Sequence, residues 1–198
     1  MAVRTRDGAA PPVRAAPLSH DIKDEKRMTK HFLEQVLLAE QPNPGVEDDL
    51  MLFGQFEGAW NVEVTWLEQG RAARKAKGEW HFGWILDGRA IQDVWIVPTR
   101  LEQGASGDLY EYGTSIRFYD ARIAAWRSTW IGPVQGSVRT FIARRRGDEI
   151  VLEGMQGDGR KIEWIFSDIG ADRFQWRFQV CGERGWEIVQ AFVCTRME

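Results

Sequence analysis

One carboxylate, Asp93, stands in a pattern of residues that could support acid–base chemistry or ligand binding. It follows the dipeptide Asp87-Gly88, which lies between two runs that alternate apolar and polar residues. Asp-Gly in that setting predicts a two-residue β-hairpin turn. The turn pairs Leu86 with Arg89, so Asp93 falls opposite Phe82. One face of the hairpin then carries Asp93 together with five apolar residues: Trp80, Phe82, Trp84, Ile91 and Trp95.

Four of those five residues are aromatic, so we expect this face to point into the protein interior. A charged carboxylate is costly to bury there unless a donor or a cation stabilises it. Asp93 could therefore accept hydrogen bonds from a tryptophan or an arginine as a structural partner. It could also anchor a ligand, or act as a general acid or base beside Tyr119 or an arginine. The sequence leaves these three roles open.

Later strands carry further aromatic and hydroxyl side chains that could line the same interior. The chain has ten tryptophans, which is more than packing alone usually needs. We predict a cavity that binds a small hydrophobic or aromatic molecule. Its predicted lining is Trp80, Phe82, Trp84, Trp95, Thr114, Phe118, Trp126, Ser128, Trp130, Trp164 and Trp176.

The last predicted hairpin allows two registers. A four-residue loop pairs Cys181 with Trp186 and Arg177 with Gln190, which leaves Arg177 and Gln190 on the solvent face. A bulge that shifts the register by one residue would bring Arg177 and Gln190 into the cavity instead.

Histidine is scarce, and we expect neither a metal nor a cofactor. The three histidines are His20, His31 and His81, and no group of His, Cys and carboxylates has metal-ligand spacing. A haem-binding barrel would need an axial ligand on the inner face. The hairpin register puts His81 opposite Val94 on the outer face.

The element pattern predicts an all-β fold, a closed antiparallel up-and-down β-barrel of about ten strands preceded by one or two N-terminal helices. We expect helices over 21–40 and 46–56 and a mobile rim loop over 98–112. The domain organisation is a flexible tail (1–20), a helical segment (21–57) and the barrel (58–198). The expected strands are 59–67, 78–86, 89–97, 113–119, 125–131, 136–143, 149–155, 160–167, 173–181 and 186–196.

Gly58-Ala59-Trp60, directly after a short predicted helix, and Arg196 in the last strand resemble the lipocalin and calycin superfamily. In that superfamily an arginine of the last strand covers the tryptophan of a G-x-W motif. The resemblance implies structural roles for Gly58, Trp60 and Arg196. Residues 78–98 and 112–118 are similar to bacterial lipocalin-like proteins of unknown function. The resemblance covers residues 50–197 and implies a barrel cavity, with no catalytic residues.

The composition argues against nucleic acid and membranes as binding partners. The net charge of −3 provides no basic face for nucleic acid, and no apolar run is long enough to cross a membrane as a helix. The N-terminus lacks the apolar core of a secretory signal, so we expect a cytoplasmic protein. Binding of a small hydrophobic molecule is the main functional hypothesis. A cofactor-independent isomerase, cyclase or hydratase with Asp93 as general acid/base is the alternative. A protein–protein interaction module and a homodimer also stay open.

Overall fold

The computed structural model describes residues 32–45, 47–102 and 111–198, and the side chains of residues 47–49 also lie outside the description. The predicted tail (1–20), most of the predicted helix 21–40 and part of the predicted rim loop fall on residues that are not described. The chain divides into two units, Met1–Gln35 and Val36–Glu198. Of the first unit, residues 32–35 are described and are helical, and this helical stretch runs on to residue 37.

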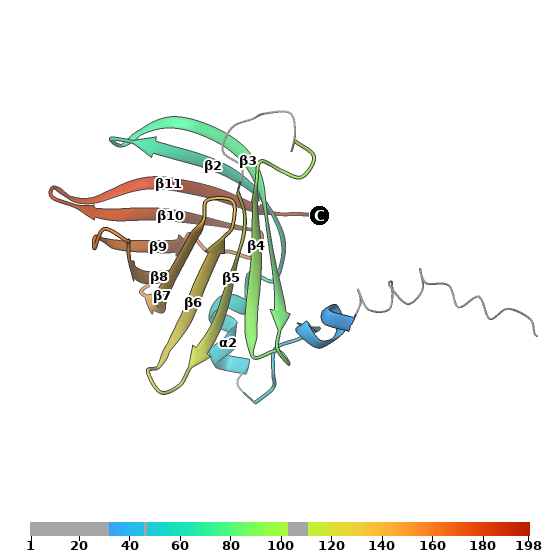
Figure 1. Cartoon of the computed structure of the whole chain (residues 1–198). Coiled ribbons are helices and arrows are strands. Elements are labelled where there is room, and N and C mark those ends of the chain that lie inside the picture. Colours follow the sequence, from blue (N-terminus) through green and yellow to red (C-terminus); the bar gives the residue numbers. More distant parts are fainter. Residues whose placement is uncertain (1–31, 46, 103–110) are drawn as a thin grey trace, which may run out of the picture. The chain divides into compact units, whose positions relative to one another are not determined.

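The second unit holds one further helix and a continuous series of strands (Figure 1). Their bounds are β1 Leu38–Ala39, α2 Glu47–Gly54, β2 Gly58–Glu68, β3 Arg71–Ile85, β4 Ala90–Val97, β5 Glu111–Asp120, β6 Ala125–Gly132, β7 Ser137–Arg146, β8 Glu149–Met155, β9 Lys161–Ser167, β10 Arg173–Gly182 and β11 Gly185–Arg196.

Strands β2 to β11 form a closed antiparallel barrel. Each strand pairs with the next one along the chain, and β11 pairs with β2 to complete the ring. This closure removes the exposed edges that an open sheet of ten strands would present. The predicted all-β, up-and-down barrel is confirmed, and each predicted strand has its counterpart.

The hairpin between β3 and β4 has the predicted register. Asp87 and Gly88 both adopt positive φ angles, 58° and 68°, as a type I′ turn requires. The amide of Arg89 donates to the carbonyl of Leu86 (3.1 Å), and Phe82 pairs with Asp93. The local turn sequence therefore sets which face of both strands points inward.

Several element boundaries differ from the sequence predictions, and two of these differences have a clear physical reason. Strand β3 begins at Arg71 rather than at residue 78, because its Lys- and Arg-rich first half pairs with β2 although it has little strand propensity of its own. The N-terminal helix was predicted to reach Glu40 but ends at residue 37. Leu38 and Ala39 instead form β1, which pairs with the end of β3 at Ile85 and Trp84.

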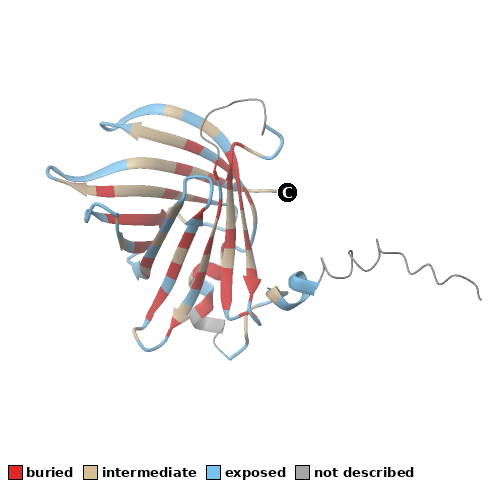
Figure 2. Ribbon diagram, viewed as in Figure 1, coloured by how far each residue is buried: buried red, intermediate tan, exposed pale blue. Residues whose placement is uncertain are grey.

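Helix α2 fills one end of the barrel. It packs three apolar side chains, Leu50, Phe53 and the following Phe56, into the interior, and each is at most 1% exposed. The ring of Phe53 lies 5.0 Å from that of Trp126, and Phe56 lies 4.9 Å from Phe166. Burial is concentrated in this half of the barrel wall (Figure 2). The barrel therefore has one end that is densely packed and closed.

The G-x-W segment and Arg196 close the same end from the outside. The Arg196 guanidinium lies 4.2 Å from the centre of the Trp60 ring, and its Nη1 donates to the carbonyl of Glu57 (2.7 Å). Gly58 adopts φ +112°, and a Cβ there would lie 2.9 Å from Arg196 Nη1. Only glycine meets both conditions without strain. This contact is the one that the lipocalin resemblance implies.

Candidate functional site

A closed belt of five aromatic rings surrounds the barrel interior beyond this packed end. Consecutive ring centroids around the belt are 4.3 to 6.0 Å apart, and the stacked pair Trp176–Phe192 is the tightest. The belt is contributed by five different strands. Its members, in order round the barrel, are Trp95, Phe192, Trp176, Trp164 and Trp130.

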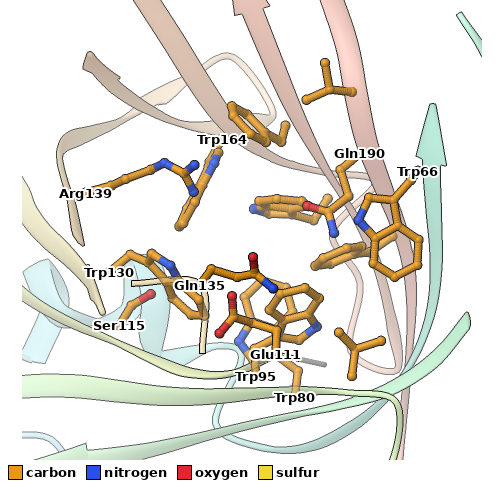
Figure 3. A pocket seen from close by; sticks show the side chains of 15 residues that line it. Trp66, Trp80, Trp95, Glu111, Ser115, Trp130, Gln135, Arg139, Trp164 and Gln190 are labelled. Atoms are coloured by element: carbon orange, nitrogen blue, oxygen red, sulfur yellow. The ribbon is translucent and has the colours of Figure 1, made fainter. Parts of the chain in front are cut away.

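The belt lines a cavity of about 310 Å³ (Figure 3). Gln135, in the turn between β6 and β7, is both exposed and part of the lining, so the cavity reaches the surface beside that turn. Five predicted residues line it, namely Trp80, Trp95, Trp130, Trp164 and Trp176. The lining residues that the sequence predictions missed are Trp66, Val97, Glu111, Ser115, Gln135, Arg139, Phe178, Val189, Gln190 and Phe192.

The indole N–H groups give this cavity an unusual hydrogen-bonding character. Four of the lining tryptophans, Trp80, Trp95, Trp164 and Trp176, have a buried Nε1 without any hydrogen-bond partner. Only the fifth predicted tryptophan has one, because Trp130 Nε1 donates to Ser137 Oγ (3.3 Å). Buried indole N–H groups normally find an acceptor. The residues that line the cavity therefore carry a set of donors that no acceptor of the protein satisfies.

A glycine makes room for one wall of the cavity. A Cβ on Gly113 would lie 2.3 Å from the Trp130 ring, so the ring lies directly against the backbone of β5. Any side chain at this position would push Trp130 out of the belt. Gly113 also pairs with Trp95, which brings two of the belt residues beside it.

Two groups of opposite charge belong to the cavity wall, Glu111 on β5 and Arg139 on β7. Burial raises the pKa of Glu111, while the amide of Tyr112 and the charge of Arg139 act in the opposite direction. Burial likewise lowers the pKa of Arg139, and the charge of Glu111 opposes that change. Arginine nevertheless stays charged in proteins. The cavity thus combines apolar walls with one fixed cation and one carboxylate that is easier to protonate than usual.

A β-bulge between β10 and β11 decides which polar residues enter the cavity. The register shifts at Phe178/Gln179, so Gln190 pairs with Phe178 and Arg177 pairs with Ala191. Gln190 therefore lines the cavity, together with the extra residue Val189. Arg177 stays outside and forms an ion pair with Glu149 (2.9 Å).

Both registers considered from the sequence were wrong for one of these two residues. The bulge lies in β11 alone and leaves the inward face of β10 unchanged, with Trp176 and Phe178 inside. It therefore moves Gln190 inward without moving Arg177.

Asp93 points inward as predicted but does not line the cavity. It is 1% exposed, and its Oδ2 accepts a hydrogen bond from Nη1 of Arg117, whose side chain is 0% exposed. The Arg117 guanidinium also lies 5.0 Å from the ring centre of Phe53. The pair is thus enclosed at the packed end of the barrel, which favours a structural role for Asp93 among the three that the sequence leaves open.

Two predicted lining residues lie on the outer face of the barrel. Thr114 pairs with Val94, which faces outward, and its Oγ1 accepts a hydrogen bond from Gln92 (2.9 Å). Phe118 is 42% exposed. The prediction chose the wrong face of β5, because its inward positions are Gly113, Ser115 and Arg117 rather than the more apolar alternate set.

The remaining predicted residues are buried but lie apart from the cavity. They belong to the packed interior rather than to the ligand space: Phe82, Trp84, Trp126 and Ser128. Trp84 shows the difference, because its Nε1 donates to a carboxylate oxygen of Glu57 (3.0 Å) and is not available to a ligand.

His81, the histidine considered as an axial haem ligand, lies on the outer face of the barrel. Its Nε2 lies 3.0 Å from Glu79 Oε2, and the same carboxylate accepts from Arg100 Nε (2.9 Å). His81 therefore cannot reach the cavity. Within the described part of the chain, no group of three His, Cys, Asp or Glu side chains could hold a metal ion. No helix among those residues is long and apolar enough to cross a membrane.

Comparison with known proteins supports the fold alone. No family model and no curated protein matches the sequence. Among solved structures, the S-type phycobiliprotein lyase CPES from Guillardia theta has a similar fold, with a TM-score of 0.50 and 9% sequence identity. The match covers 75% of this chain and 92% of that chain. It supports the antiparallel β-barrel fold, whereas the predicted likeness to bacterial lipocalin-like proteins finds no support in the sequence comparisons.

Proposed function

We propose that this protein binds a small, flat hydrophobic or aromatic molecule inside the barrel. The observation that carries the proposal is the set of four unpartnered indole N–H groups on residues that line one cavity. Packing alone does not account for them, because a core tryptophan gains from pairing its N–H, as Trp60 does with the carbonyl of Phe56 (2.7 Å). A ligand that carries acceptor atoms would satisfy the donors.

The size and the walls of the cavity agree with this function. Its volume of about 310 Å³ is at the lower end of the roughly 300–1,000 Å³ typical of small-molecule sites. The belt presents ring faces and edges from several directions, which suits stacking against a planar molecule. The structural neighbour is a lyase for phycobiliproteins by its name, and at 9% identity it adds the barrel and nothing on the ligand.

The enzyme hypothesis is not favoured by the position of its proposed acid/base. Asp93 is paired with Arg117 and does not contribute to the cavity wall. A general acid or base must come within hydrogen-bond distance of the reacting group. A role in binding, with Asp93 as part of the scaffold, is the better fit to the geometry.

Fluorescence titration with the neutral probe N-phenyl-1-naphthylamine tests the proposal, alongside native mass spectrometry of the purified full chain for a co-purified molecule. The probe should quench tryptophan emission as it fills the belt. Gln190→Trp places a bulky ring in the cavity wall and should weaken probe binding by about tenfold or more. Ile188→Trp, on the same strand but outside the cavity lining, is the matched control and should bind normally. Equal probe affinity in both variants would contradict binding inside the barrel.

A further inference from the structure

The cavity contains more hydrogen-bond donors than acceptors, and this imbalance bears on the chemistry of the ligand. The donors are four free indole N–H groups, the guanidinium of Arg139 and the amide of Gln190. The one carboxylate in the lining, Glu111, already accepts the amide N–H of Tyr112 at its Oε1 (3.2 Å). This excess of donors on the lining residues favours a ligand that carries acceptor oxygens.

Arg139 provides the site at which such oxygens could be concentrated. Its guanidinium lies 5.5 Å from the ring centre of Phe178, so the side chain is held against the wall of the cavity. Figure 3 shows Arg139 and Gln190 reaching into the cavity from different strands. A guanidinium supported on an aromatic ring keeps its N–H edges available for bidentate contact with a carboxylate.

The protein does not neutralise Arg139 directly. Among the described residues, no carboxylate lies within 4.0 Å of its guanidinium, whereas other arginines of the barrel, such as Arg117, Arg146 and Arg177, have ion-pair partners. Glu111 influences Arg139 from a greater distance. A half-buried cation in an apolar cavity is costly, and a bound anion would offset that cost.

We propose that the ligand is a flat aromatic carboxylate whose anionic group pairs with Arg139 while its ring system lies within the tryptophan belt. This inference rests on the proposed binding function and specifies its ligand class. Glu111 sets the orientation, because its charge repels the ligand carboxylate from its own part of the wall. Arg139 is then the residue that distinguishes an acid from a neutral molecule of the same shape.

Competition against N-phenyl-1-naphthylamine with two isosteric probes tests the inference. 2-Naphthoate and 2-naphthamide share one ring system and differ in charge. The wild-type protein should bind the naphthoate about 10- to 100-fold more tightly, as expected for a charge-assisted pair away from water. Arg139→Gln should abolish this preference, because the naphthoate should lose more affinity than the naphthamide. Glu111→Gln should raise the ratio of naphthoate affinity to naphthamide affinity.

The controls separate the ligand class from general effects. Arg144→Gln makes the same change in net charge on the same strand, and Arg144 is exposed outside the cavity, so it should retain the full preference. Arg139→Lys keeps the charge and loses the bidentate geometry, so it should keep part of the preference. It also provides the comparison if Arg139→Gln does not fold.

The possible failures are distinguishable. Equal affinity for both probes in the wild-type protein would overturn the inference while the neutral probe still binds. A preference that survives Arg139→Gln would also overturn it. If none of the three probes bound, the result would instead contradict the proposed binding function.

Discussion

The buried pair Asp93–Arg117 permits a quantitative test of whether Asp93 is structural. Each single substitution leaves a charge without a partner at a position that solvent does not reach, since both side chains are 0% exposed. Asp93→Leu strands the guanidinium of Arg117, whose Nε and Nη2 already lack partners. Arg117→Met strands the carboxylate, whose Oδ1 also lacks one. Each single variant should lose about 3–5 kcal/mol of unfolding free energy.

The double variant Asp93→Leu/Arg117→Met should be more stable than either single variant. It removes both charges together, and the two apolar side chains can pack against Phe53 and Phe82. The pair is incompletely hydrogen-bonded, so its replacement should cost little. The coupling energy of the double-mutant cycle, which is the sum of the two single losses minus the loss of the double variant, should therefore be about 5 kcal/mol or more. Part of the loss in Arg117→Met is the cation–π contact with Phe53, worth about 0.5–2 kcal/mol.

Urea denaturation followed by tryptophan fluorescence and circular dichroism measures the cycle. The exposed pair Asp158–Arg160 provides the matched cycle, with Asp158→Leu and Arg160→Met, and its coupling should be close to the limit of measurement. Full stability of Asp93→Leu would refute a structural aspartate. So would a normal fold with weakened binding of N-phenyl-1-naphthylamine, because it would return Asp93 to the ligand site.

Three further outcomes follow from the described contacts. Arg196→Met should lose about 1–3 kcal/mol of unfolding free energy in urea denaturation, because it removes the contact with Trp60 and the hydrogen bond to the carbonyl of Glu57; wild-type stability would contradict the role of Arg196 in closing the barrel end. Gly58→Ala should cost about 1–3 kcal/mol for its positive φ alone, and a neutral effect in the same assay would mean that the backbone relaxes there. Glu111→Gln should stabilise the protein at neutral pH. Burial raises the pKa of Glu111, so the folded state favours its protonated form, and wild-type stability should fall as pH rises through the unfolded and then the folded pKa. Denaturation midpoints measured between about pH 4 and 7 should show that fall in the wild type and a smaller one in the variant.

The sequence was most informative where a local turn determines the geometry. Asp87-Gly88 fixes the hairpin register from two residues alone, and the inward face with Trp80 and Trp95 follows from it. The structural roles of Gly58 and Trp60 came instead from the lipocalin resemblance, and their contact with Arg196 agrees with it. Local chemistry and final structure agree at these positions.

The prediction failed where burial is decided by contacts distant in sequence. In β5 the apolar residues Ile116 and Phe118 favour one face, but the buried face carries Ser115 and Arg117. Arg117 can be inside because Asp93 on the neighbouring strand neutralises it. A hydrophobicity pattern cannot reveal such an ion pair between two strands. The long connection before β5 also provides no turn from which its register could be counted.

The bulge in β11 escaped prediction for a similar reason. The extra residue is Val189, which carries none of the glycine signal that often marks a bulge. The bulge places Gln190 in the cavity, so the position of one residue of the candidate site depends on a backbone irregularity that has no sequence signal.

Arg139 was missed for a different reason, because an arginine near the start of a strand is usually solvated.

The two arginines inside this barrel show how burial separates a structural cation from a binding one. Arg117 is fully buried, ion-paired and in contact with phenylalanine rings, so its substitution should change stability. Arg139 is half-buried in the wall of a cavity and has no ion-pair partner among the described residues, so its substitution should change ligand preference. The unfolding free energy and the naphthoate-to-naphthamide affinity ratio can be measured for Arg117→Met and Arg139→Gln. Arg117→Met should lower the unfolding free energy, and Arg139→Gln should lower the affinity ratio. If Arg139→Gln lowered stability as much as Arg117→Met and left the affinity ratio unchanged, Arg139 would have a structural role. The ligand of the cavity would then be a neutral molecule rather than a carboxylate.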